Sequence, residues 1–163
     1  MKAYLDNNVV SAIARDDSPL ESHAITRLLK TWKDGEVELV TSEITLREIQ
    51  QYQGEARPAL DDVFELLQKV PIVRWDELVA INVQIDQYTC INSPIIQNDP
   101  MYDELQAAGL EPVDAQHVFV ATKQACISFL TCDKGIRRRA QMIKVICGID
   151  VRTPSVFVAT QGW

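Results

Sequence analysis

The sequence contains few of the residues that build sulfur- or imidazole-based centres. It has two histidines and four cysteines in 163 residues. No two cysteines form a CxxC pair, and none has ligand-type spacing with His23 or His117. We therefore expect reduced thiols that serve as small core residues in a cytoplasmic protein, and neither a zinc site nor a disulfide framework.

Long hydrophobic runs are also missing. No apolar run approaches the roughly 20 residues that a membrane span requires. The first residues resemble the start of a signal sequence, but Asp6, Asn7 and Asn8 interrupt the apolar segment early. We expect no signal sequence and no membrane segment. Because the chain also lacks internal repeats, we expect one domain over residues 1–163.

Positive charge is scarce in this chain. It has 23 acidic and 16 basic residues, which gives a net charge of −7. Nucleic-acid binders are usually basic, because neutralising phosphates supplies much of their affinity. The charge therefore argues mildly against a nucleic-acid substrate, unless part of the acidity is a metal-binding cluster or faces a basic protein partner.

Short β-type runs alternate with helical patterns along the chain. This alternation predicts an α/β fold with a mainly parallel sheet covered by helices on both faces. The predicted strands are Lys2–Leu5, Glu38–Thr41, Pro71–Arg74, Ile127–Cys132 and Asp150–Arg152. The predicted helices are Leu20–Lys33, Pro58–Val70, Asp76–Tyr88 and Val113–Ala125, with a short one near Tyr102–Ala108.

Acidic residues lie at the ends of these strands. Asp6 follows the first strand and Asp133 follows Ile127–Cys132. In an open parallel sheet, sites form at the carboxyl ends of the strands. These carboxylates therefore converge if the two strands are neighbours. A lone Asp after a strand is often only a turn residue, so the site hypothesis depends on several acids occurring together.

Asp114 begins the helix that precedes the strand ending at Asp133. It heads a helix face whose next members are all apolar: Val118, Ala121 and Ala125. This pattern predicts a carboxylate that faces the interior. The alternative is an N-cap, and the two roles can coexist.

The helix after the second strand offers two candidate acids, Glu43 and Glu48. Glu43 is nearer to the strand end, whereas Glu48 lies one turn beyond Ile44 and could face inward. The residues alone leave this choice open. Ser42 and Thr131, at strand ends near the acids, could orient them by hydrogen bonds or serve in turns and caps.

A cluster of carboxylates points to divalent-metal chemistry. Crowded carboxylates repel one another and have raised pKa values unless cations neutralise them. Mg²⁺ and Mn²⁺ prefer oxygen ligands, bind substrate phosphate and activate water. An acidic pocket without a His or Cys nucleophile therefore indicates phosphodiester hydrolysis. We expect a structural role for His117, because a metal-bound water needs no side-chain base.

Four local sequences resemble those of the PIN-domain nucleases, and more narrowly of the VapC-type toxins. They are KAYLDNNVVSAI, TSEITLREI, VDAQHVFVATKQA and FLTCDKGIRRRA. The resemblance identifies the catalytic and metal-binding acids as Asp6, Glu48, Asp114 and Asp133, and so selects Glu48 over Glu43. The chain departs at Asn7, where the family more often has Thr or Ser. Asn7 could still orient the first carboxylate.

The resemblance implies a PIN-like (Rossmann-like) three-layer α/β/α sandwich with a mainly parallel sheet of about five strands. It also implies cleavage of RNA with one or two Mg²⁺ or Mn²⁺ ions per site, frequent homodimers, and a toxin silenced by an antitoxin that enters the acidic groove. Such a partner would agree with the net charge of −7. Lys134, Arg137 and Arg138 could contact RNA phosphates or form a solvated helix face.

Two other classes of protein fit part of these observations. The aspartyl-phosphate phosphatases and dehalogenases use a nucleophilic Asp after the first strand. The phosphatases also need a second acid two residues later, where this chain has Asn8. A catalytically inactive PIN-like module that binds RNA or protein is the other alternative. The presence of all four acids argues against it.

Overall fold

The structure, a computed structural model, describes residues 1–15, 18–51, 70–73 and 99–163. The predicted helices Pro58–Val70 and Asp76–Tyr88 lie outside the described residues, apart from Val70 itself. One domain over residues 1–163 therefore stays a prediction. No helix in the described segments is long and apolar enough to cross a membrane.

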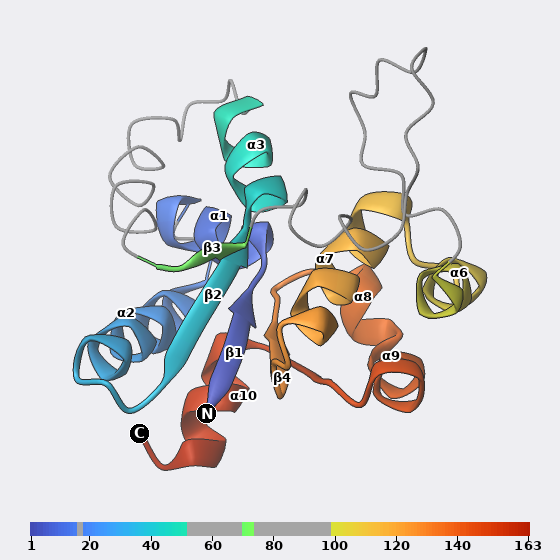
Figure 1. The fold of residues 1–163 in the computed structure, drawn as a ribbon. Coiled ribbons are helices and arrows are strands. Elements are labelled where there is room, and N and C mark those ends of the chain that lie inside the picture. The colour runs from blue at the N-terminus through green and yellow to red at the C-terminus, as the bar shows by residue number, and fades with distance from the viewer. Residues whose placement is uncertain (16–17, 52–69, 74–98) are drawn as a thin grey trace.

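A five-stranded parallel sheet forms the centre of the described structure (Figure 1). Its strand order is β3-β2-β1-β4-β5, and every pairing is parallel. The strands are β1 Lys2–Leu5, β2 Glu38–Ser42, β3 Ile72–Val73, β4 Ser128–Leu130 and β5 Asp150–Arg152. The predicted α/β fold is confirmed. So is the condition that the first strand and the strand before Asp133 are neighbours, because β1 pairs with β4.

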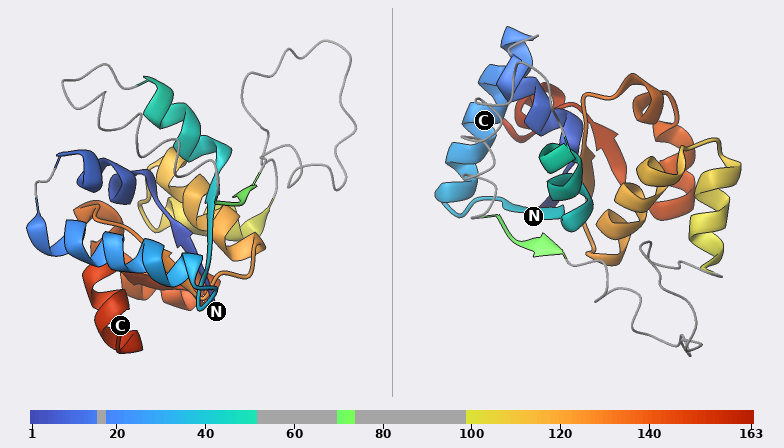
Figure 2. Two further views of the ribbon diagram at one scale, coloured as in Figure 1. Left: turned by 90° about the vertical axis from the view of Figure 1, so that its left-hand side faces the viewer. Right: turned by 90° about the horizontal axis from the view of Figure 1, so that it is seen from above.

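Helices cover both faces of the sheet, which makes a three-layer sandwich (Figure 2). Buried side chains on one face come from α1 Asn7–Arg15, α2 Pro19–Lys33, α3 Glu43–Gln51 and α10 Pro154–Gln161. Those on the other face come from α6 Pro100–Ala107, α7 Pro112–Lys123, α8 Lys134–Arg138 and α9 Ala140–Cys147.

The side chains of β1 alternate between the two layers. Ala3 and Leu5 belong to the core with α2 and α10, whereas Tyr4 belongs to the core with α7. This is the two-residue period of a strand, and it places the next residue, Asp6, on the Tyr4 side. The first acid of the predicted cluster therefore faces the layer that contains α7.

Proline marks where several helices begin. α2, α6, α7 and α10 each have proline in the first turn, where its missing N–H costs no hydrogen bond. Two of these helices have a capping side chain as well. Asp99 accepts a bond from Met101 N at 3.1 Å, and Thr153 accepts one from Val156 N at 3.3 Å.

Several element boundaries differ from those expected from the sequence. The helix predicted over Val113–Ala125 ends at Lys123. Ala125 is exposed and has φ 54°, so it does not continue the apolar face of Asp114. Helices α1, α9 and α10 have no counterpart among the predicted helices, because segments of eight or nine residues are too short to show a clear helical period.

The buried face of α2 generates a stability prediction. Leu28 is fully buried in the core beneath β1, whereas Leu20 on the same helix is 69% exposed. Replacing Leu28 by Ala should lower the free energy of unfolding by about 2–5 kcal/mol, because it leaves a cavity. Leu20→Ala should change it by less than about 0.5 kcal/mol. Urea denaturation of both variants measures the difference, and equal effects would contradict this description of the core.

Candidate active site at the carboxyl edge of the sheet

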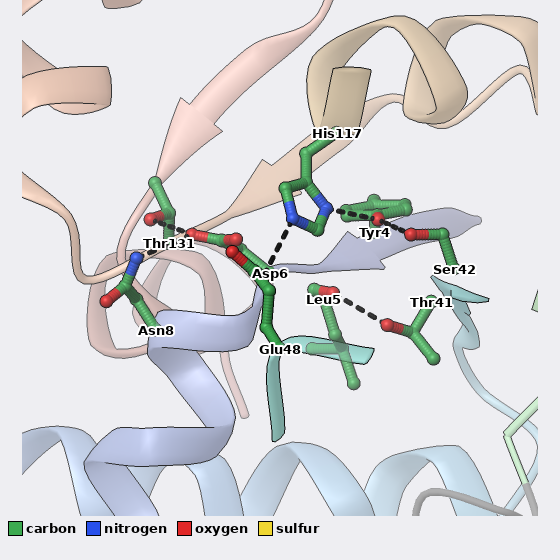
Figure 3. Close-up of polar contacts among 9 residues, drawn as sticks. All are labelled: Tyr4, Leu5, Asp6, Asn8, Thr41, Ser42, Glu48, His117 and Thr131. Carbon is green, nitrogen blue, oxygen red and sulfur yellow. Dashed lines mark hydrogen bonds and ion pairs between the residues drawn. The ribbon is translucent and has the colours of Figure 1, made fainter. Parts of the chain in front are cut away.

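Asp6 lies at the carboxyl end of the central strand and is 2% exposed. Its backbone N–H donates to Leu130 O at 3.1 Å, which carries the β1–β4 pairing one residue further. Its Oδ2 accepts a hydrogen bond from Thr131 Oγ1 at 2.6 Å and a longer one from Asn8 Nδ2 at 3.4 Å (Figure 3). The carboxylate is thus held by the ends of two strands and the first turn of α1.

Thr131 connects Asp6 to Asp133. Besides donating to Asp6, its Oγ1 accepts a bond from the backbone N of Asp133 at 2.9 Å. Asp133 in turn caps α8, because its Oδ1 accepts from Ile136 N at 2.9 Å. The cap engages one carboxylate oxygen of Asp133, and the hydroxyl of Thr131 fixes the spacing of the two acids.

Glu48 belongs to a chain of hydrogen bonds that crosses four elements (Figure 3). Its Oε2 lies 3.0 Å from Nε2 of His117 on α7. Nδ1 of His117 lies 2.7 Å from the hydroxyl of Tyr4 on β1, and that hydroxyl donates to Ser42 Oγ on β2 at 2.6 Å. Tyr4, Ser42 and His117 are buried, whereas the side chain of Glu48 is 34% exposed.

The proton positions in this series of hydrogen bonds follow from the donors available. The phenol of Tyr4 has one proton and gives it to Ser42, so Nδ1 of His117 donates to Tyr4. An ionised Glu48 can only accept, so Nε2 donates as well. Burial alone lowers the pKa of His117. The hydrogen bond to Glu48 and the charges of Asp6, Glu48 and Asp114 outweigh that effect, and the pKa is raised.

Asp114 lies in the first turn of α7, half-buried. It is not the N-cap, which is Glu111. Burial raises the pKa of Asp114 to about 6, and the charges of Asp6, Asp133 and Glu48 add to this shift, whereas His117 opposes it. The other three sequence-predicted acids therefore all lie within electrostatic reach of Asp114.

The same crowding affects Asp6. Burial raises its pKa, and the charge of Glu48 raises it further. The charge of His117 and the hydrogen bonds from Thr131 and Asn8 act in the opposite direction. Both Asp6 and Asp114 are thus carboxylates whose ionised form lacks enough compensating positive charge, which is the condition that a bound cation relieves.

These acids fit a hard divalent cation in chemistry and charge. In the described part of the chain, no three Asp, Glu, His or Cys side chains are gathered closely enough to hold a metal ion as they stand. Mg²⁺, however, is commonly bound through one or two carboxylates with water in the other positions. Asp6 and Asp114, whose pKa values are raised, are the candidates to hold such a cation, and Glu48 and Asp133 are near enough to Asp114 to be further candidates.

The remaining sequence-predicted site residues differ in their placement. Thr131 contacts Asp6 directly, whereas Ser42 bonds to Tyr4 and reaches Glu48 only through His117. Asn7 Oδ1 is buried and has no hydrogen-bond partner among the described residues. The residue that bonds to Asp6 is Asn8, one position later.

The basic residues after Asp133 separate into two groups. Lys134, Arg137 and Arg138 on α8 are exposed. Arg139 instead turns inward, where its guanidinium donates to Gly135 O at 3.0 Å and to Ala108 O at 3.3 Å. The exposed residues can contact a ligand, and Arg139 has a structural role.

Sequence reasoning missed Tyr4 and Asn8 as members of this site and assigned His117 only a structural role. A signal for Tyr4 existed, since strand alternation places it on the same side as Asp6 two residues later. No sequence signal indicated the bond between Glu48 and His117, because 69 residues separate them.

Comparisons with known proteins support the fold. No protein-family model matches the chain, and no curated protein matches it significantly. A solved structure with a similar fold is the crystal structure of VapBC2 from Rickettsia felis bound to a DNA fragment from their promoter. The TM-score is 0.58 at 14% identity, over 94% of this chain and 98% of that chain. The fold is therefore PIN-like and similar to that of a chain in the VapBC2 structure.

The raised pKa of Asp114 predicts a pH-dependent stability of the metal-free protein. The folded state binds this proton more tightly than the unfolded chain, whose carboxyl has a pKa of about 3.9. Ionised Asp114 therefore destabilises the fold above pH 6, and this cost disappears as the pH falls toward 4. In EDTA at pH 8, Asp114→Asn should raise the melting temperature by on the order of 2 °C.

The control for this experiment is Asp103→Asn, which changes an exposed aspartate on α6. It should give no stabilisation at pH 8, and the benefit of Asp114→Asn should shrink at pH 5. Melting curves by circular dichroism at the two pH values test both points. A stabilisation that is the same at pH 5 and pH 8 would show that charge crowding is not its cause.

Proposed function

We propose that this protein is a metal-dependent endoribonuclease that hydrolyses RNA phosphodiester bonds, and that it is the toxin of a toxin–antitoxin pair. The observation that supports the proposal is that Asp114 lies near Asp6, Glu48 and Asp133 in a PIN-like fold whose parallel strands β1 and β4 end beside Asp6 and Asp133. Buried carboxylates without enough positive charge are what a nuclease needs to bind Mg²⁺ or Mn²⁺ beside a phosphate.

The residues of the chain have distinct parts in this proposal. Asp6 and Asp114 would hold the cation, and Thr131 keeps Asp6 in one orientation through its 2.6 Å bond. One or two bound Mg²⁺ or Mn²⁺ ions would polarise the phosphoryl group and supply an activated water. No side chain in this cluster needs to act as a nucleophile.

Binding of RNA and of an antitoxin would involve different surfaces. The exposed Lys134, Arg137 and Arg138 lie within five residues after Asp133 and can neutralise RNA phosphates beside the site. The net charge of −7 favours a second, basic partner, such as an antitoxin tail that carries a basic side chain into the acidic groove. The fold neighbour VapBC2 supports this at the level of the fold, and the homodimer stays a prediction.

RNA cleavage in defined metal conditions tests the activity. Purified, partner-free protein should cut single-stranded or structured RNA with Mg²⁺ or Mn²⁺ and not with EDTA. Asp6→Asn, Glu48→Gln and Asp114→Asn should each lower the rate by at least about 100-fold while the domain stays folded. Asp133→Asn should have the smallest effect, because a helix cap engages one of its oxygens.

Glu43→Gln is the matched control for Glu48→Gln. Glu43 lies on the same helix, and its ion pair is with Arg47 on the surface, not with the acid cluster. This variant should cleave at the wild-type rate. Full activity of Asp114→Asn would refute the mechanism. RNA that is bound but never cut, with either metal, would instead support the inactive binding module.

Cleavage should also depend on the exposed basic residues of α8. Replacing Lys134, Arg137 and Arg138 together by Ala should weaken RNA binding several-fold and reduce its salt dependence, because each contact to a phosphate releases counterions. Metal affinity should not fall, because the substitutions remove only positive charge near the cation site. Filter-binding measurements at two salt concentrations give the slopes, and an unchanged slope would place the RNA elsewhere.

A further inference from the structure

We propose that His117 is a positioning residue for Glu48 and is itself held by hydrogen bonds that run through Tyr4 to Ser42. This series of hydrogen bonds sets the affinity of the site for its divalent cation. The inference rests on the proposed function, because it takes Glu48 to be part of the cation site. It assigns a specific role to three buried polar residues that do not themselves belong to the carboxylate cluster.

The first step is the contrast in burial between His117 and Glu48. His117 is 1% exposed, but the side chain of Glu48 is 34% exposed. A long, partly exposed glutamate on a helix surface has many rotamers available and loses entropy when it is fixed. The 3.0 Å contact between Glu48 Oε2 and Nε2 of His117 selects one of these rotamers.

The second step is the rigidity of the group that makes this contact. The ring of Tyr4 stacks on Phe129 with centroids 5.2 Å apart and meets the ring of His117 edge-on at 5.9 Å. Its hydroxyl is bonded to both Ser42 and His117. The imidazole is therefore fixed by a bond to Nδ1 and by ring packing, so its Nε2 points in one direction.

The third step is that the contact leaves part of Glu48 available. His117 engages Oε2, and the described residues make no hydrogen bond to Oε1. A carboxylate that accepts one hydrogen bond keeps further acceptor capacity for a cation or its bound water. Partners that orient ligating carboxylates in this way typically account for 10–100-fold in metal affinity.

A histidine with a purely structural role in the core would have different hydrogen-bond partners. It would find both of its partners among buried groups, as it does at Tyr4. The second partner of His117 is instead a partly exposed carboxylate from α3, which is the acid whose charge also acts on Asp6 and Asp114. The contact therefore connects the core of the protein to the acid cluster.

Mn²⁺ binding, measured by electron paramagnetic resonance of the free ion, tests the proposal without any RNA. His117→Ala should weaken Mn²⁺ binding 10–100-fold. In a Glu48→Ala background the same change should weaken binding far less, because only the charge of His117 on Asp6 and Asp114 is then lost. His23→Ala, which changes an exposed histidine on α2, is the matched control and should bind as wild type does.

Two conservative variants separate positioning from folding. The amide of His117→Gln can replace Nε2 as the donor to Glu48, whereas that of His117→Asn can replace only Nδ1. Gln should therefore recover most of the Mn²⁺ affinity and Asn should not, although both alter the core. Tyr4→Phe removes the hydroxyl behind the ring and should weaken binding several-fold.

Two outcomes would overturn the inference. One is wild-type Mn²⁺ affinity in His117→Ala, and the other is an equal loss in the presence and absence of Glu48. In either case the proposed function survives, provided that the wild-type protein binds Mn²⁺ and cleaves RNA. If the wild-type protein binds no divalent cation, the proposed function fails, and the positioning role fails with it.

Discussion

The burial of Asp6 at the end of the central strand is the constraint on which the rest of the site depends. A carboxylate that is 2% exposed carries a high desolvation cost, which hydrogen bonds and nearby charge must offset. That compensation comes from Thr131 just after β4, from Asn8 on α1 and from His117 on α7. Three segments around β1 thus each contribute a group that stabilises the carboxylate of Asp6.

Strand pairing and helix packing each position part of the site. The parallel pairing of β1 with β4 brings Asp6 within reach of Thr131 and, through it, of Asp133. The packing of α7 on the same face brings His117 against Tyr4 and Glu48. A change at Tyr4, in the core, can therefore alter the geometry of a carboxylate at the surface.

Crowding of like charges is tolerated here at a cost in stability. Asp114 has a pKa of about 6 because it lies half-buried among other acids. Carboxylates with strongly raised pKa values are often found at functional sites, and a cation-binding site is one example. The imidazole of His117 lowers the cost only in part, since the pKa values of Asp6 and Asp114 are raised despite it.

Local sequence patterns determined much of the fold. Apolar runs predicted β1, β2, β4 and β5 to within a few residues, because strand alternation and chain order are local properties. They failed for α1, whose first residues Asn7 and Asn8 have the composition of a turn, and for the end of α7, where Ala125 leaves the helix. Short segments near a strand end carry too few residues to show a helical period.

By itself, the sequence determined that acids follow the strand ends, because that depends only on the order of residues along the chain. Only the tertiary structure decided which side chains form hydrogen bonds to these acids. The bond of Thr131 to Asp6 spans 125 residues and that of His117 to Glu48 spans 69. Contacts between such distant residues depend on strand order and helix packing, which no local pattern specifies. Asn8, not Asn7, bonds to Asp6 for the same reason, since the start of α1 sets the direction of each side chain.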